Sequence, residues 1–210
     1  MDLIFFGMQG AGKGTLGKFV AQRYGLQIFE TGSELRKLAQ EDSELGKKVK
    51  SIIEAGHLVP NDVVMEIVEN FIHNLKEGSN VLFDGIPRKV EQAHSLNKLL
   101  DRHNRVYKGV LIDISKETAL KRLTTRKICN ECKTVYPVMY TKDECEACGG
   151  ELITRSDDNP ESIKTRLDTY EKETIPAINL YNDKLIKIDG EPSIEVVNKT
   201  AFEVLDKELK

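Results

Sequence analysis

A glycine-rich loop directly after a short apolar run places the strongest constraint on how this chain can fold. Residues 7–15 read GMQGAGKGT, the apolar run 3–6 precedes them, and residues 13–24 have a helical pattern. Between a strand and a helix, glycines let backbone N–H groups turn toward phosphate oxygens, and Lys13 can reach the outer phosphates. The alternative is a glycine-rich turn with an incidental lysine. The strand, loop and helix in register favour a phosphate loop (P-loop) for a nucleoside triphosphate.

Short apolar runs alternate with helical patterns along most of the 210 residues. This alternation predicts an α/β fold, a P-loop parallel sheet flanked by helices. We expect strands at residues 3–6, 28–29, 81–83, 110–114 and 185–188. Further helices are expected to begin at caps, namely Ser43, Asn61 with Asp62, Ser115, Asn159 and about Ser193.

The charge and the apolar runs argue against several classes of partner. The net charge is −3 and the pI is about 5.9, so the chain has no overall attraction for nucleic acid or an anionic membrane. No run approaches the ~18 apolar residues that cross a bilayer. Asp2 stands where a signal peptide would carry a basic residue. We therefore expect a cytoplasmic protein that binds neither nucleic acid nor membranes.

A second candidate site residue follows a predicted buried strand. Residues 81–88 read VLFDGIPR, which places Asp84 at the carboxyl end of that strand. Parallel sheets bind ligands at this edge, and a carboxylate there can hold Mg²⁺, through water because Mg²⁺ keeps much of its hydration shell. The alternative is a surface aspartate that caps a turn.

Two stretches interrupt the sheet pattern. Residues 31–59 are helical and largely charged, and residues 127–158 have no helical period but contain all four cysteines. The cysteines form two C-x-x-C pairs separated by twelve residues, at Cys129, Cys132, Cys145 and Cys148. Four thiolates in this pairing favour a closed structural Zn²⁺ site in a small zinc-ribbon-like insertion, although disulfides or free thiols are alternatives.

Several segments, in order over nearly the whole chain, resemble adenylate kinases. They are GMQGAGKGT, ETGSELR (30–36), GHLV (56–59), DGIPR (84–88) with Gln92, and TRSDDNPESIKTRL (154–167). The resemblance implies a core of residues 1–29, 60–120 and 159–210, an inserted helical nucleotide-binding clamp at 30–59, and a zinc-bearing lid at 121–158. It also implies a monomer that converts Mg·ATP and AMP to two ADP.

The same resemblance implies roles for individual residues. Residues on the ATP side would be Gly10, Ala11, Gly12, Lys13, Gly14, Thr15, Arg122, Arg126, Val135, Tyr136 and Pro192. Residues on the AMP side would be Thr31, Arg36, His57, Leu58, Val59, Gly85, Ile86, Pro87, Arg88, Gln92, Arg155 and Arg166. Catalysis would depend on Lys13, Asp84, Arg88, Arg122, Arg155 and Arg166.

The implied chemistry suits this set of side chains. The nucleophile would be a phosphate oxygen that is already anionic, so the protein need only position it and neutralise charge, and arginine forks bind phosphate well. Asp157 and Asp158 lie next to Arg155 and either pair with arginines or serve as plain charges at a helix start.

The chain departs from the usual family pattern at Gln9, Ser33 and Ile86, where proline, aspartate and phenylalanine are common. Ser33 matters most, because a carboxylate there could help to order the hydrated metal. Two alternatives stay open: another nucleoside monophosphate kinase that uses CMP, UMP or GMP, and a nucleotide-binding module without catalysis.

Overall fold

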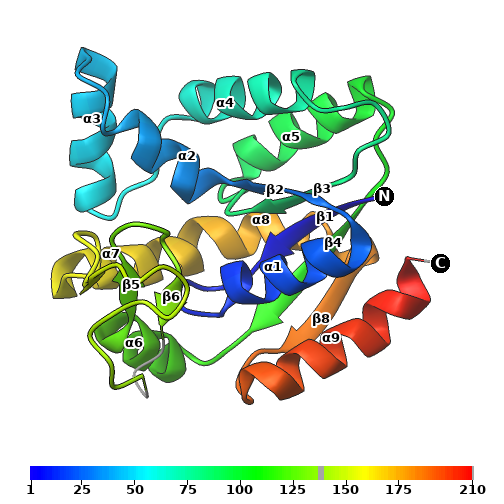
Figure 1. The fold of residues 1–210 in the computed structure, drawn as a ribbon. Helices are drawn as coiled ribbons and strands as arrows, with labels where there is room; N and C mark the ends of the chain where they lie inside the picture. Colours follow the sequence, from blue (N-terminus) through cyan, green and yellow to red (C-terminus); the bar gives the residue numbers. More distant parts are fainter. Residues whose placement is uncertain (137–139, 210) are drawn as a thin grey trace.

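A five-stranded parallel sheet forms the centre of the protein. The computed structural model describes residues 1–136 and 140–209. The strands are β1 (Asp2–Phe6), β2 (Gln27–Glu30), β3 (Val81–Asp84), β4 (Tyr107–Asp113) and β8 (Leu185–Asp189). Their order is β2-β3-β1-β4-β8, and every neighbouring pair is parallel (Figure 1). The predicted parallel sheet and its five strands are confirmed.

Helices cover both faces of this sheet (Figure 1). On one face α1 (Lys13–Tyr24) packs against α9 (Ile194–Glu208), and on the other α5 (Val90–Arg102) packs against α4 (Asn61–His73) and α8 (Ile175–Asn179). Because both faces are covered, β1 and β3 are apolar and buried almost throughout. None of the described helices is long and apolar enough to cross a membrane.

Side-chain capping hydrogen bonds mark the starts of three of the described helices. Ser43 accepts from the Gly46 N–H before α3 (Glu44–Glu54), and Ser115 accepts from the Thr118 N–H before α6 (Lys116–Thr125). Asn159 does the same for α7 (Pro160–Thr169), as predicted. The prediction for α4 was wrong: Pro60 is its N-cap and Asn61 its first residue, because the Asn61 amide turns away to Glu91 and Ser95 on α5.

Two insertions leave the sheet at its carboxyl edge (Figure 1). Helices α2 (Thr31–Leu38) and α3 follow β2, and we call residues 30–59 the clamp. Residues 121–158, the lid, contain a small antiparallel sheet in the order β6-β5-β7. Its strands are β5 (Lys127–Cys129), β6 (Val135–Tyr136) and β7 (Leu152–Ile153), and no described residue from 127 to 158 is helical.

Candidate nucleotide-binding site

The P-loop joins β1 to α1 in a conformation that only glycine adopts readily. Gly7, Gly10 and Gly12 have φ values of 146°, 86° and 89°. A Cβ on Gly7 would lie 2.4 Å from the Ile112 carbonyl oxygen, so the loop also sits too close to β4 for a side chain there. Gly12 is the N-cap of α1, which places the N-terminus of that helix at the loop. The loop is therefore built to present backbone N–H groups to an anion.

The side chain of Lys13 binds back to the backbone of this loop. Its Nζ donates to the Gly7 and Met8 carbonyl oxygens at 2.7 and 3.1 Å. Loss of water around the ammonium lowers its pKa to about 8; Asp84 opposes this change, whereas Arg88, Arg166 and Arg126 reinforce it. An ammonium that lies among other cations gains from an incoming polyanion.

Asp84 lies at the end of β3 next to the P-loop, with 8% of its surface exposed. Its carboxylate has no hydrogen bond or ion pair with the part of the chain that the structure describes, and a Cβ on Gly14 would lie 3.8 Å from its Oδ2. Burial raises its pKa, and the charge of Glu30 adds to this effect, while Lys13, Arg88 and Arg36 oppose it. A buried carboxylate without a partner beside a phosphate-binding loop fits a cation that arrives with the nucleotide.

Arg122 on α6 connects the P-loop to the end of the sheet. It donates to the Gly10 carbonyl at 3.4 Å and to the Gly190 carbonyl at 2.9 Å. It also reaches the Glu191 carbonyl at 3.2 Å, directly before Pro192. Arg122, Pro192 and the P-loop are thus brought together, as the ATP-side predictions require.

The two lid residues on the predicted ATP side differ in the exposure of their side chains. Val135 is 47% exposed. The Tyr136 side chain is buried inside the lid, where its hydroxyl lies 3.1 Å from Cys145 Sγ and accepts from the Glu146 N–H. Only the backbone of Tyr136 remains for contact with a nucleotide.

A pocket with an empty volume of about 610 Å³ opens between the clamp and the sheet edge. Its lining includes ten of the twelve residues predicted on the AMP side: Thr31, Arg36, His57, Leu58, Val59, Gly85, Arg88, Gln92, Arg155 and Arg166. The other two lie elsewhere, because Ile86 is 1% exposed within the core and Pro87 lines a smaller neighbouring cavity with Lys13.

Several polar atoms in this pocket are available to bind a ligand. The Thr31 hydroxyl oxygen is buried and has no partner among the described residues. Gln92 is 3% exposed, and its Oε1 accepts from the Arg88 N–H at 2.9 Å, which turns the amide nitrogen the other way. The Arg88 side chain is fixed by a 2.9 Å bond from Nε to the Gly85 carbonyl. A hydroxyl, an amide and several arginines that line one pocket suit a nucleoside monophosphate.

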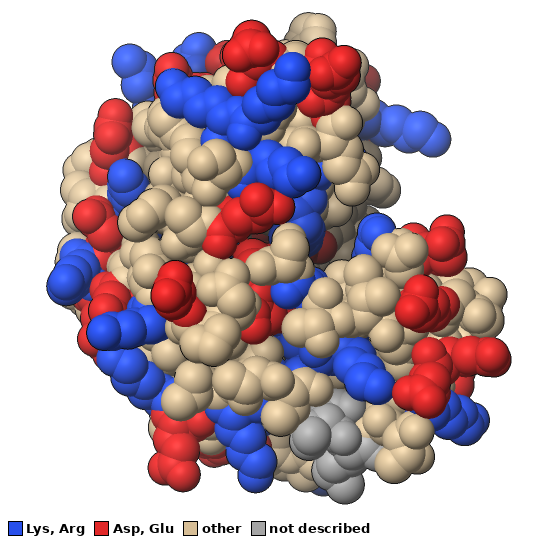
Figure 2. Space-filling view, turned by 90° about the vertical axis from the view of Figure 1, so that its left-hand side faces the viewer, with Lys and Arg blue, Asp and Glu red and all other residues tan. Residues whose placement is uncertain are grey.

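The surface is notched where the pocket opens. Figure 2 shows this notch between the part of the molecule that carries α3 and the part that carries the lid, with Lys and Arg side chains visible inside it. Burial lowers the pKa of Arg88, and Asp84 opposes that change while Arg155 adds to it. The pKa of Arg166 falls to about 10 for the same leading reason. The concentration of positive charge favours phosphate groups in the notch.

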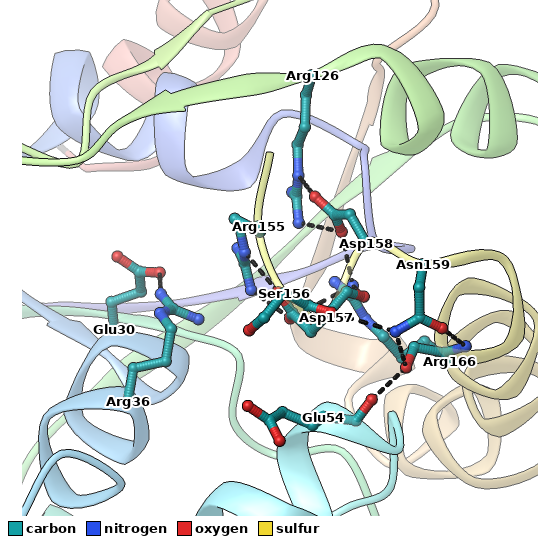
Figure 3. A network of polar contacts seen from close by, with 11 residues as sticks. Glu30, Arg36, Glu54, Arg126, Arg155, Ser156, Asp157, Asp158, Asn159 and Arg166 are labelled. Atoms are coloured by element: carbon teal, nitrogen blue, oxygen red, sulfur yellow. Dashed lines mark hydrogen bonds and ion pairs between the residues drawn. The ribbon is translucent and has the colours of Figure 1, made fainter. Parts of the chain in front are cut away.

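Asp157 and Asp158 hold three of these arginines in a buried network (Figure 3). Arg155 Nε donates to Asp157 at 2.7 Å, and Arg126 NH2 donates to Asp158 at 2.8 Å. Arg166 reaches the Asp158 carboxylate at 3.0 Å and the Asp157 carbonyl at 2.9 Å. Of the two roles that the sequence left open, pairing with arginines is the one observed.

The electrostatics of Asp157 reflect the same contacts. Burial alone would raise its pKa, but the hydrogen bond and charge of Arg155, with Arg166 and Arg126, lower it to about 2. The carboxylate therefore stays charged and keeps its arginines oriented at neutral pH.

The clamp touches this network at the end of α3. Ser162 on α7 donates its hydroxyl hydrogen to the Glu54 carbonyl. Gly56, with φ of 78°, lies so close to α7 that a Cβ there would be 2.7 Å from the Ser162 carbonyl oxygen. The clamp is therefore packed directly against the helix that leaves the lid.

The four cysteines gather at one end of the lid. Their Sγ atoms all lie within 4.8 Å of one another, and none is in a disulfide. Cys129 and Cys145 are buried, whereas Cys132 and Cys148 are exposed. Four sulfur ligands in this arrangement can hold one tetrahedral Zn²⁺ and leave no position open for a substrate.

One acidic residue of the site had no assigned role from the sequence. Glu30 lies in the ETGSELR segment and pairs with Arg36 at 3.1 Å (Figure 3). The position of Glu30 at the end of a predicted strand, like that of Asp84, was the available signal.

Comparisons with known proteins agree with this geometry. The sequence profile of the adenylate kinase family matches residues 5–186. An adenylate kinase of Kosmotoga olearia is 39% identical over 213 residues, which cover 98% of this chain and 99% of that one. Adenylate kinases of Archaeoglobus fulgidus and Staphylococcus aureus are 37% and 36% identical, with similar coverage.

Proposed function

This chain belongs to the adenylate kinase family, and we propose that it transfers the terminal phosphoryl group of Mg·ATP reversibly to AMP, which gives two ADP. One observation carries the proposal. The pocket lined by Thr31 and Gln92 and the smaller cavity lined by Lys13 share Gly85 and Arg88. Donor and acceptor phosphates are thereby expected to meet at Arg88.

On the donor side, the backbone N–H groups of the P-loop and the N-terminus of α1 would bind the ATP phosphates. Lys13 exchanges the Gly7 and Met8 carbonyls for phosphate oxygens. Arg122, which contacts Gly10 and the backbone before Pro192, fixes the donor relative to the sheet edge. Mg²⁺, which would be held near Asp84, neutralises charge on the phosphates when it is bound.

On the acceptor side, Thr31 and Gln92 would contact the base, and Arg36 and Arg88 would contact the phosphate. The attacking oxygen is already anionic, so the reaction needs alignment and charge neutralisation rather than a general base. Arg88, Arg155 and Arg166 line the acceptor pocket and would bind the phosphoryl group during its transfer.

The lid would exclude water, which is the competing acceptor. Asp157 and Asp158 already orient the arginines of the lid. Closure of the lid would therefore bring oriented arginines to the phosphate groups. We propose that Cys129, Cys132, Cys145 and Cys148 hold Zn²⁺ as a structural ion of the lid. We further propose that the protein acts as a monomer in the cytoplasm without nucleic acid or membrane partners.

The test measures ADP formation from Mg·ATP with AMP, CMP, UMP, GMP or water as acceptor in separate reactions. We expect fast turnover with AMP and little with water. Preference for another nucleotide would be consistent with the proposed mechanism, but it would show that Thr31 and Gln92 do not select adenine. Tight ATP binding with no transfer to any acceptor would favour a binding module instead.

A further inference from the structure

The end of β2 places a second carboxylate beside Asp84. Glu30 and Asp84 are the last residues of neighbouring parallel strands, and they are paired in register. Side chains of paired residues in parallel strands project to the same face of the sheet. The two carboxylates therefore leave the sheet at the same edge, next to the P-loop.

Two further observations distinguish this pair from a chance acidic cluster. Asp84 is more than nine-tenths buried and makes no hydrogen bond or ion pair with the described residues, so only the more distant charges of Lys13, Arg88 and Arg36 offset its own. Glu30 is the N-cap residue of α2, but its side chain makes no capping hydrogen bond. Among the described residues its carboxylate pairs with Arg36 alone, at 3.1 Å, and the Glu30 side chain is 45% exposed.

Ser33 lies three residues after Glu30, as the third residue of α2. The side chains of an N-cap residue and of the third helical residue both lie on the first turn of a helix. A carboxylate at position 30 can thus reach the region that a carboxylate at position 33 would occupy. Glutamate is also longer than aspartate by one methylene group, which extends that reach.

We infer that Glu30 is the second carboxylate of the magnesium site and that it acts with Asp84 on water molecules bound to the Mg²⁺ of Mg·ATP. Mg²⁺ is commonly held through one or two carboxylates together with substrate phosphates and several waters. The Arg36 guanidinium, which Glu30 holds in the structure, becomes available to the acceptor phosphate when Glu30 turns to the hydrated cation. This inference rests on the proposed binding of Mg·ATP at the P-loop.

The experiment compares two dissociation constants for ATP, one with saturating Mg²⁺ and one in buffer that a resin has freed of divalent ions. No soluble chelator is used, because it would also attack the cysteine site. The ratio of the two constants reports the contribution of the metal without any measurement of turnover. In Glu30→Gln we expect this ratio to fall about five- to tenfold, the size of one charge interaction at about 4 Å that is screened by bulk water.

Two variants make the result specific. Ser33→Asp, added to Glu30→Gln, returns a carboxylate to the first turn of α2 and is expected to restore most of the ratio. Glu34→Gln removes an equally charged residue of α2 that pairs with Lys37, and it should leave the ratio unchanged.

Other results would overturn the inference. An unchanged ratio in Glu30→Gln together with weakened AMP binding would show that Glu30 only positions Arg36. If the unmodified protein itself binds Mg·ATP no better than ATP, the proposed magnesium site at Asp84 fails as well. Active transfer to AMP with an unchanged ratio in Glu30→Gln would remove the role of Glu30 and leave the proposed function intact.

Discussion

The clamp and the lid are both inserted at the carboxyl edge of the sheet, yet their buried side chains belong to different apolar clusters. Leu35, Val49 and Val59 of the clamp are part of the main core. In the lid, Leu123 of α6 still belongs to the main core, but the buried residues beyond α6, namely Cys129, Tyr136, Cys145 and Leu152, form a cluster of their own. A cluster so small buries too little apolar surface to stabilise the lid by itself, so we propose that a metal held by the four cysteines stabilises the lid, whereas packing in the main core stabilises the clamp.

This difference predicts how each insertion unfolds. An insertion whose side chains are part of the core unfolds together with the core. An insertion held by a local site can unfold on its own while the core stays intact. Variants that attack each kind of support should therefore give different patterns of unfolding.

The largest effect is expected at the cysteines. Cys145→Ser removes one of four predicted ligands, and structural zinc sites contribute about 10–16 kcal/mol to the folding of small domains. Zinc content should fall from about one ion per chain to nearly none, and hydrogen exchange should become fast in residues 121–158 while β1 and β3 stay protected. A zinc-free protein with an unchanged melting temperature, activity and lid protection would contradict the dependence of the lid on metal.

The arginine network at the base of the lid should give the next largest effect. Asp158→Asn removes a charge whose side chain is fully buried and leaves Arg126 and Arg166 without it, which costs about 3 kcal/mol. Urea unfolding measures this loss. Asp168→Asn, in a partly exposed pair with Lys116, is the matched control and should change the free energy of unfolding by less than about 1 kcal/mol.

The clamp should respond as part of the core. Val49→Ala on α3 removes two buried methyl-sized groups and should lower the free energy of unfolding by about 2 kcal/mol in a single global transition. Leu45→Ala on the same helix is the control, because Leu45 is 44% exposed and its loss should cost about 0.5 kcal/mol or less. A separate early transition of the clamp in Val49→Ala would show that the clamp, like the lid, is independent of the core.

The smallest expected effect is a pH dependence of ATP binding at the P-loop, which lies outside both insertions. The pKa of Lys13 is lowered to about 8 in the free protein, so its charge is present below pH 8 and is lost above it. ATP affinity should fall by up to about tenfold per pH unit above 8. In Lys13→Arg the side chain stays charged, and the slope should disappear even if binding is weaker. The same slope in Lys13→Arg would assign the titration to another group.

Local signals in the sequence determined much of this protein. The glycine loop, the caps at Ser43, Ser115 and Asn159, and the spacing of the cysteines each act over a few residues, and the structure contains all of them. Such signals depend on backbone sterics and short-range hydrogen bonds, which do not require the rest of the fold. Asn61 was predicted incorrectly because a tertiary contact with α5 competed with capping.

Only the tertiary structure decided which distant groups meet. Glu30 lies beside Asp84 because β2 pairs with β3, and strand order does not follow from the apolar pattern of each strand. Asp157 and Asp158 find Arg126 and Arg166 because the lid returns to the sheet next to the helix from which it leaves. Likewise, the free hydroxyl of Thr31 is visible only once its surroundings are known. A sequence specifies which chemical groups are present, but burial and pairing across the fold determine which of them are left for a ligand.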